Sequence, residues 1–335
     1  MKQYIGMIIL TLMILGLACR SNSNPETGLI RGQVKDTTGS NIAMATVELG
    51  QLSLQILTND TGYYEIPDIE PGDHVMKASK PTYLPAIETV TVTAGEASTV
   101  NFTIIQNPRN VLSEMLTTAC HCGDPSRIEA YGLKDQHHSR MVYLEYHASS
   151  DAHFDTWDPF STVGSETRRL YYCDTFLIGA LLFVDGTTCL TSSSAYAAVI
   201  DSVLAVPSPL LIDLSGTYAS SAQSGNVSVV ITALDSISDT DLEVGYAVYE
   251  RGPIYYSPIG ETVPFRYVLV NLLIPDGVNL TYGQPVTLNK DFTVPDIIGL
   301  PLPPFHVVDV NNIGIAVYVQ SVNSKRVLQA QSLDF

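Results

Sequence analysis

Three side chains that can react or bind a metal are consecutive in one short stretch: Cys120, His121 and Cys122. Asp124 and Pro125 follow and favour the start of a helix, as an N-cap and a first helical residue. A cysteine at the start of a helix has a stabilised thiolate, which suits thiol–disulfide exchange. A dithiol oxidoreductase has the spacing Cys-x-x-Cys, so that the second thiol can resolve a mixed disulfide formed by the first. The spacing here is Cys-x-Cys, and we predict that the chain does not exchange disulfides efficiently.

Two functional hypotheses remain for this stretch. In the first, the chain is a thiol–disulfide oxidoreductase with Cys122 as the nucleophile and Cys120 as its partner thiol. In the second, the chain carries copper or zinc, because thiolates and imidazoles suit both metals. The ligands would be Cys120, His121, Cys122 and His147. The main prediction is neither of these: a chain without a cofactor, whose cysteines form structural disulfides.

Besides Cys19, the chain has four cysteines, and an even number in an exported protein favours disulfide bonds. The candidates are Cys120, Cys122, Cys173 and Cys189. One member of the first two bonds to one member of the last two, or the first two form a strained local bridge. The sequence leaves these pairings open.

The N-terminal residues are typical of an export signal. A lysine precedes an apolar run from Ile5 to Leu17, which is too short to span a bilayer as a helix. Small residues and Cys19 end the run, an arrangement that resembles a bacterial lipobox. We predict a signal peptide over residues 1–18, lipidation of Cys19 and a polar tether over residues 19–28. The expected location is the bacterial cell envelope, as an exported outer membrane lipoprotein.

Composition narrows both the fold and the partners. Lys and Arg number 17 and Asp and Glu number 34, so the formal net charge is −17. Nucleic acids and anionic lipid surfaces would repel such a chain, which argues against both as partners. Basic residues are scarce, whereas Val, Ile, Thr, Ser, Tyr, Gly and Pro are abundant, a balance typical of many short strands and turns. A chain of this length is expected to form two or three domains.

Residues 29–106 predict a small antiparallel β-sandwich, because short alternating runs are separated by turns rich in Gly, Asn, Asp and Pro. The segments GLIRGQVKDTTGSNIAMATVEL, TNDTGYYEIPDIEPGDHVMKAS and VTVTAGEASTVNFTI resemble the carboxypeptidase regulatory-like domain, a transthyretin-type sandwich. That resemblance implies a spacer or docking module without chemistry of its own. The zinc peptidase that accompanies some of these domains would need a His-x-x-Glu motif, which the sequence lacks.

Residues 107–207 alternate strands with helices. The pattern predicts strands at 111–116, 141–146 and 180–184 and helices at 125–138, 159–172 and 194–206. Such alternation indicates an α/β layer in which a helix crosses between parallel strands. Residues 208–335 return to alternating strands, which predict a C-terminal β-sandwich.

Four segments carry a second resemblance: NVLSEMLTTACHCGDPSR, MVYLEYHASSDAHFD, RRLYYCDTFLIGALLFVDGTT and NNIGIAVYVQSVNSKRVLQAQ. Together they are similar to the Omp-twenty-eight-related family of surface lipoproteins, over residues 109–335. The resemblance implies a thioredoxin-like domain joined to a C-terminal β domain. Members typically carry Thr-Gly-x-x-Cys-x-x-Cys-Pro after the first strand and a proline before the third. Here the second cysteine of that spacing is missing and Ala180 stands in the place of the proline, which argues against exchange chemistry.

The sequence therefore predicts a multidomain chain. It has an N-terminal all-β sandwich at 29–106, a central α/β thioredoxin-like domain at 107–207 and a C-terminal all-β sandwich at 208–335. The predicted role is binding, assembly or display rather than turnover. The expected partners are the membrane, through the lipid anchor, and other envelope proteins or surface glycans, but not nucleic acid.

Overall fold

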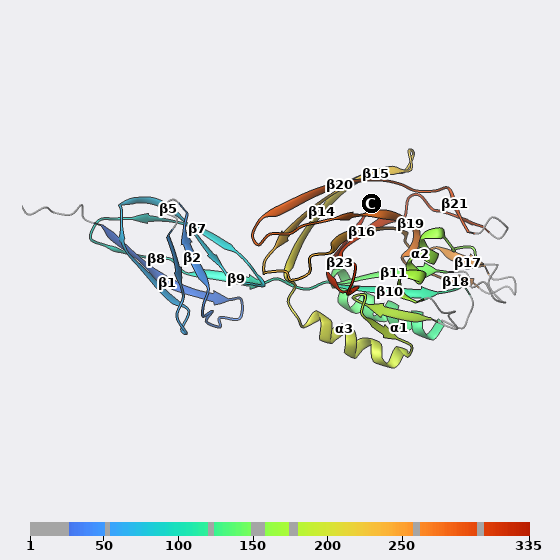
Figure 1. Cartoon of the computed structure of the whole chain (residues 1–335), viewed down its shortest axis with the longest axis horizontal. Helices are drawn as coiled ribbons and strands as arrows, with labels where there is room; N and C mark the ends of the chain where they lie inside the picture. Colours follow the sequence, from blue (N-terminus) through green and yellow to red (C-terminus); the bar gives the residue numbers. More distant parts are fainter. Residues whose placement is uncertain are drawn as a thin grey trace, which may run out of the picture. The chain divides into compact units, whose positions relative to one another are not determined.

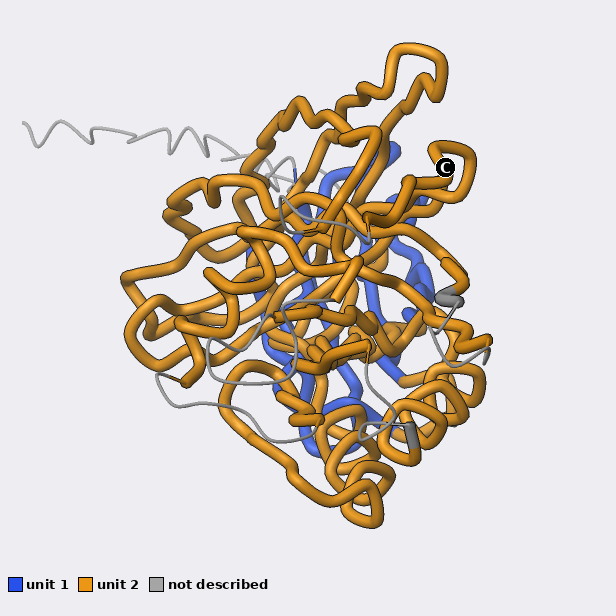
Figure 2. The backbone as a smooth tube through the Cα atoms, turned by 90° about the vertical axis from the view of Figure 1, so that its right-hand side faces the viewer, with its two compact units in different colours: residues 1–35, 41–77, 87–102 blue, residues 36–40, 78–86, 103–335 orange. Residues whose placement is uncertain are grey.

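The computed structural model describes residues 27–50, 54–119, 124–148, 158–173, 180–256, 262–299 and 305–335. The chain divides into two compact units, coloured blue and orange in Figure 2. Unit 1 holds the described residues of 1–35, 41–77 and 87–102, and unit 2 holds those of 36–40, 78–86 and 103–335. Within the described ranges, no helix is long and apolar enough to cross a membrane.

Unit 1 is built from short strands in two sheets (Figure 1). They are β1 (Gly28–Asp36), β2 (Thr46–Leu49), β3 (Leu54–Leu57), β4 (Tyr63–Ile69), β5 (Gly72–Ser79), β7 (Ala86–Val92) and β8 (Ala97–Thr99). One sheet contains β4, β1 and β8, and the other has the order β3-β2-β5-β7. Side chains alternate along β1, where Ile30 and Val34 are buried and Arg31 is exposed. This alternation gives each sheet one apolar face, and the two faces form the core of the predicted sandwich.

The turn from Asn59 to Gly62 illustrates the turn chemistry of unit 1. Asn59 Oδ1 accepts the backbone N–H of Thr61 at 2.9 Å and that of Tyr63 at 3.0 Å. Gly62 has a φ of +72°, and a Cβ at this position would lie 2.5 Å from the carbonyl oxygen of Val34. Only glycine fits such a conformation and such a close approach.

Unit 2 contains the helices and the longer strands. Its helices are α1 (Asp124–His137), α2 (Val163–Tyr172) and α3 (Tyr196–Leu204). Its strands up to α3 are β6 (Tyr83–Leu84), β9 (Phe102–Gln106), β10 (Val111–Thr117), β11 (Met141–His147), β12 (Leu181–Val184) and β13 (Thr188–Leu190). The later strands are β14 (Leu210–Ala219), β15 (Ser224–Ala233), β16 (Leu242–Glu250), β17 (Ile254–Tyr256), β18 (Thr262–Pro264), β19 (Val268–Gly277), β20 (Pro285–Thr293), β21 (Ile297–Ile298), β22 (His306–Val307), β23 (Ile313–Ser321) and β24 (Val327–Asp334).

One eight-stranded sheet runs through unit 2 in the order β13-β12-β10-β11-β19-β16-β23-β24. Strands β10 and β11 are parallel, whereas β12 is antiparallel to β10 and β13 is antiparallel to β12. Helices α1 and α3 pack on one face of these strands, and the end of α2 packs on the other. Because both faces are covered, every residue of β10 and β11 is buried.

A second sheet, with the order β14-β15-β20, packs against β16 and β23 through the largest core cluster (Figure 1). These two layers account for the strands that the sequence predicts over 208–335. The predicted boundary between residues 207 and 208 falls inside unit 2, and the eight-stranded sheet contains strands from both sides of it. Glu145 of β11 pairs with Val268 of β19, and its N–H donates to the carbonyl of Tyr267 at 2.9 Å. Backbone hydrogen bonding therefore joins the α/β layer to the C-terminal strands.

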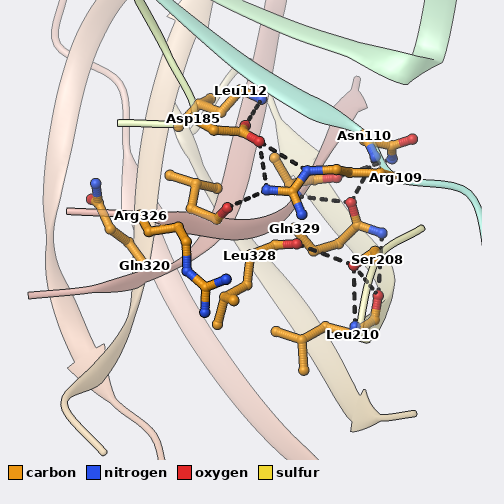
Figure 3. Close-up of polar contacts among 12 residues, drawn as sticks. Arg109, Asn110, Leu112, Asp185, Ser208, Leu210, Gln320, Arg326, Leu328 and Gln329 are labelled. Carbon is orange, nitrogen blue, oxygen red and sulfur yellow. Dashed lines mark hydrogen bonds and ion pairs between the residues drawn. The ribbon is translucent and has the colours of Figure 1, made fainter. Parts of the chain in front are cut away.

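A buried polar cluster adds a second connection between these parts (Figure 3). Arg109 Nη2 donates to the carboxylate of Asp185 and to the carbonyl of Val327, both at 2.6 Å. Asp185 also accepts the N–H of Leu112 at 2.8 Å. Burial raises the pKa of Asp185, and the adjacent Arg109 opposes that rise. The cluster joins the start of β10, the turn after β12 and the start of β24.

Candidate functional site

The cysteine stretch connects β10 to α1. Cys120, His121 and Cys122 lie outside the described residues, and the roles predicted for them stay predictions. Their described neighbours show how the two ends of the stretch are held. Because β10 and β11 are parallel, their carboxyl ends meet, and Thr117 pairs with His147 in the ladder. The candidate site is therefore built around His147.

His147 is held between two carboxylates. Its Nδ1 lies 2.9 Å from Oδ2 of Asp158, and its Nε2 lies 3.5 Å from Oε2 of Glu145. All three side chains are buried, and those of His147 and Glu145 expose no surface. Burial alone lowers the pKa of His147, but the two carboxylates outweigh it and raise the pKa to about 9. The raised pKa favours the protonated imidazole at neutral pH, in which both ring nitrogens donate.

Asp158 also positions the residue that precedes the cysteines. Its Oδ2 accepts the backbone N–H of Ala119 at 2.8 Å, and its Oδ1 accepts that of Phe160 at 2.9 Å. One buried carboxylate thus connects the chain just after β10, the approach to α2 and the imidazole at the end of β11. Hydrogen bonds to an ionised acceptor are among the stronger ones, so this carboxylate holds the backbone firmly.

Arg127 of α1 holds the other end of the stretch. Its side chain is almost fully buried, and its Nη1 donates to the carbonyl of Thr118 at 3.0 Å. Its guanidinium lies 4.5 Å from the centroid of the Phe265 ring, within range of a cation–π interaction. The helix after the cysteines is thereby tied back to the chain before them.

Aromatic rings enclose His147. The rings of Phe160 and Phe265 lie 5.1 Å and 4.8 Å from the imidazole, centroid to centroid. The ring of His306 also packs against Phe160, with centroids 4.7 Å apart. The Nε2 of His306 lies 2.6 Å from Oε2 of Glu250. These apolar walls keep water from the ionised groups, which strengthens the attraction among them.

Glu145 has two further hydrogen-bond partners, Tyr131 of α1 and Tyr143 of β11. The hydroxyls of Tyr131 and Tyr143 both donate to its Oε1, the latter at 3.2 Å. Burial, and after it the charge of Glu145, raises the pKa of both tyrosines. They therefore stay neutral, and they donate hydrogen bonds to a buried carboxylate.

His147 is the predicted site residue that the structure places here, at the end of β11 where the sequence expects it. The sequence does not single out Glu145, Asp158 or Arg127. Glu145 leaves a signal, because a charge within the otherwise apolar run MVYLEYH needs a partner when buried. Asp158 and Arg127 give no such signal in the sequence, because their local sequence is like that of solvent-exposed charged residues.

Metal binding stays a prediction. In the part of the chain that the structure describes, no group of three or more His, Cys, Asp or Glu side chains is arranged to hold a metal. At His147, a metal ion would have to displace Asp158 or Glu145, because a protonated imidazole has no free lone pair to give.

The other two cysteines are described. Cys173 is the C-cap of α2 and is half-buried, and Cys189 lies in β13 and is exposed. Burial raises the pKa of the Cys189 thiol, and Cys173 adds to the rise. The predicted bonds from either residue to Cys120 or Cys122 stay predictions.

Unit 2 also has an apolar hollow on its surface. A cavity of about 490 Å³ lies between the start of α2 and β19. Val163 and Ile274 border it and are 86% and 82% exposed. Exposed apolar side chains that gather in one place are a feature of interaction surfaces.

Comparison with known proteins identifies the N-terminal part of the chain. Residues 29–104 match the family model of the carboxypeptidase regulatory-like domain. The match confirms the domain predicted for this segment and agrees with the sandwich of unit 1. No curated protein sequence matches the chain.

Solved structures resemble larger parts of the chain. HBP35 of Porphyromonas gingivalis has a TM-score of 0.51 and 13% identity, over 68% of this chain and 76% of that one. A protein of Agrobacterium tumefaciens has a TM-score of 0.46 and 15% identity, over 68% and 95%. A domain of the outer membrane lipoprotein Omp28 from Porphyromonas gingivalis has a TM-score of 0.24 and 16% identity, over 38% and 87%. The likeness to HBP35 is one of fold, and it carries no activity or ligand with it.

Proposed function

We propose that this chain is a bacterial cell-envelope protein in which residues 107–207 form a thioredoxin-like domain that serves binding, assembly or display. The succession β10-α1-β11-α2-β12-β13-α3 and the strand order β13-β12-β10-β11 support this proposal. Both match what is expected of a thioredoxin-like fold. The cysteine stretch, between the first strand and the first helix, lies where such a fold carries its thiols.

The main support for a non-catalytic role is the raised pKa of His147 and the balance of its charge by two carboxylates. Exchange requires a thiolate, which a base or a positive environment must favour. Asp158 and Glu145 raise the pKa of His147 to about 9, and its side chain has no exposed surface, so near neutral pH it is a poor acceptor for the proton of a thiol. Its charge is balanced by Asp158 and Glu145 and therefore offers a thiolate little net stabilisation.

Two departures from the thioredoxin pattern also support a non-catalytic role. The cysteines have the spacing Cys-x-Cys, and Ala180 directly precedes β12, where thioredoxin-like proteins have a proline beside the thiols. Ala180 is buried in the core under α1 and α3. The edge at which such proteins hold a substrate chain is therefore built differently in this one.

The proposed partners are the membrane, through a lipid on Cys19, and another envelope protein or a surface glycan. Cys19 lies outside the described residues, and its lipidation rests on the sequence. The exposed Val163 and Ile274 support a protein partner, because such a partner would cover the apolar hollow that they border. The formal net charge of −17 argues against nucleic acid.

Turnover assays separate binding from exchange. The mature protein is incubated with insulin or glutathione disulfide, and reduction is followed beside the Cys122→Ser variant. We expect the wild-type protein to be no faster than this variant. A rate that Cys122→Ser abolishes would establish a thiol–disulfide oxidoreductase and would overturn the proposed role. His147→Gln is the matched control, because it alters the same site and keeps both thiols.

Fatty-acid labelling tests the anchor. Bacteria that express the full chain are grown with a clickable palmitate analogue, and the label is measured on the purified protein and in the membrane fraction. The wild-type protein should carry the label, and Cys19→Ala should lose both the label and the membrane association. The control is Cys189→Ala, which removes a cysteine from β13. An unlabelled wild-type protein in the soluble fraction would contradict the anchor.

A further inference from the structure

Cys189 faces the side of the eight-stranded sheet that carries the end of α2. Leu190, the next residue in β13, packs into the core under α1 and α3, on the opposite face. Successive side chains of a strand point to opposite faces, so Cys189 points toward α2. In the antiparallel ladder Cys189 pairs with Phe183, which belongs to the core cluster under α2. Cross-strand neighbours of this kind have their Cβ atoms about 5 Å apart.

The end of α2 packs on the same ring through Tyr172, the residue before Cys173. Tyr172 stacks on Phe183 with ring centroids 4.2 Å apart and an interplanar angle of 11°. Cys173 follows Tyr172 directly and packs against the same core cluster. The electrostatic effect of Cys173 on the Cys189 thiol agrees with this closeness. Cys189 is therefore the cross-strand partner of Phe183, and Cys173 directly follows the residue whose ring stacks on Phe183.

We propose that Cys173 and Cys189 form a disulfide bond that fastens the end of α2 to the edge strand β13. The two thiols lose their protons and their sulfurs join, and two electrons reduce the S–S bond of a disulfide oxidant to two thiols. Cys189 is exposed, so such an oxidant can reach it. A disulfide needs about 4.4–6.8 Å between the two Cα atoms.

The bond limits the disulfide partners that are left for Cys120 and Cys122. With Cys173 and Cys189 joined and Cys19 lipidated as proposed, Cys120 and Cys122 can bond only to each other or stay as thiols within the chain. The disulfide in the cell rests on the proposed export, because an oxidising compartment supplies the oxidant. The geometry itself does not depend on export, and the experiment examines it separately.

Peptide mapping of the full mature protein tests the bond. The reduced protein is oxidised with glutathione disulfide, alkylated with iodoacetamide and cleaved before aspartate. Trypsin would leave both cysteines in one peptide, because no Lys or Arg lies between Arg169 and Arg251. Cleavage before Asp174 and Asp185 separates them into peptides 158–173 and 185–200. We expect these two peptides to be linked to each other. A link from either to the peptide that carries Cys120 and Cys122, or alkylation of both, would overturn the proposal.

Three comparisons complete the experiment. The double variant Cys120→Ser/Cys122→Ser must keep the link between peptides 158–173 and 185–200. Cys189→Ser should lower the Tm of the oxidised protein by several degrees, and the difference should vanish in reductant. Equal Tm values without reductant would count against a stabilising bond. A link that forms with glutathione disulfide but is absent from protein isolated from the envelope would refute export and leave the geometry standing.

Discussion

Arg168 of α2 and Glu114 of β10 form a buried bidentate ion pair. Nε of Arg168 lies 2.7 Å from Oε1 of Glu114, and Nη2 lies 2.8 Å from Oε2. Arg168 also donates to the side chain of Gln320 in β23 at 3.0 Å. The rings of Tyr171, Tyr172 and Tyr318 lie around the guanidinium at 4.9, 4.6 and 5.0 Å from their centroids. A single cation therefore connects α2 to both the α/β strands and the C-terminal strands of the sheet.

Replacing Arg168 with Met should destabilise the protein strongly, because it leaves Glu114 buried without its counter-charge. Removal of one partner from a buried pair costs about 3–5 kcal/mol. The double variant Glu114→Gln/Arg168→Met should recover most of that loss, because it removes both charges. Urea unfolding measures the two free energies. The exposed pair between Asp135 and Arg266 provides the control, and Asp135→Asn should cost at most about 1 kcal/mol. A similar small cost for Arg168→Met would refute the expected contribution of the pair.

The free energy of unfolding should fall as the pH rises from 6.5 to 9. His147 has an ordinary pKa of 6.5 and a pKa of about 9 in the folded protein, so the folded state binds the proton more tightly. Its stabilisation is complete below pH 6.5 and is lost as the pH rises through about 9. Urea titrations across this range should show a decline that His147→Gln flattens. His138→Asn removes an exposed imidazole and serves as the control. An unchanged pH slope in His147→Gln would contradict the protonated state inferred for this site.

Gly186→Ala should destabilise unit 2. Gly186 has a φ of +74°, and a Cβ there would lie 1.9 Å from the backbone carbonyl oxygen of Lys325. Neither atom can move easily, so we expect a loss of more than about 2 kcal/mol. Gly132→Ala is the matched control, because Gly132 lies within α1 with open space around it. This second change should stabilise the protein by about 0.5–1 kcal/mol. Comparable Tm values for the two variants would show that the turn after β12 tolerates a side chain.

Protein purified without chelator should contain no stoichiometric copper or zinc. The reason lies at His147, where carboxylates face both nitrogens and compete with any metal. Elemental analysis of the mature protein provides the measurement. Near one equivalent of metal, lost in Cys122→Ser, would instead support a metal site in the cysteine stretch.

Local patterns were sufficient for most elements of the fold. Alternation and turn residues predict the sandwich of unit 1, and the turn that ends at Gly62 appears where the sequence expects it. The strand predicted at 111–116 is β10, and the helix predicted at 125–138 is α1 within one residue at each end. Strand β13 was missed, because three residues of mixed polarity show no period of their own. Its pairing with β12 creates the strand.

The candidate site was predictable only in part. His147 stands out because an imidazole ends an apolar strand next to a cysteine loop. Asp158 looks like any polar residue of a surface loop, yet it is buried and joins Ala119 to His147. The rings of Phe160 and Phe265 lie against the imidazole that Asp158 contacts, and they come from other parts of the chain.

The sequence by itself determined the helices, the turns and most of the longer strands, because side-chain periodicity and turn chemistry act over a few residues. Only the tertiary structure decided that Glu145 pairs with Val268 and that the α/β layer and the C-terminal strands share one sheet. It also placed two carboxylates beside His147, which raise the pKa of that imidazole. Such outcomes depend on which distant groups are brought together and shielded from water, and a local pattern records neither the neighbour nor the burial.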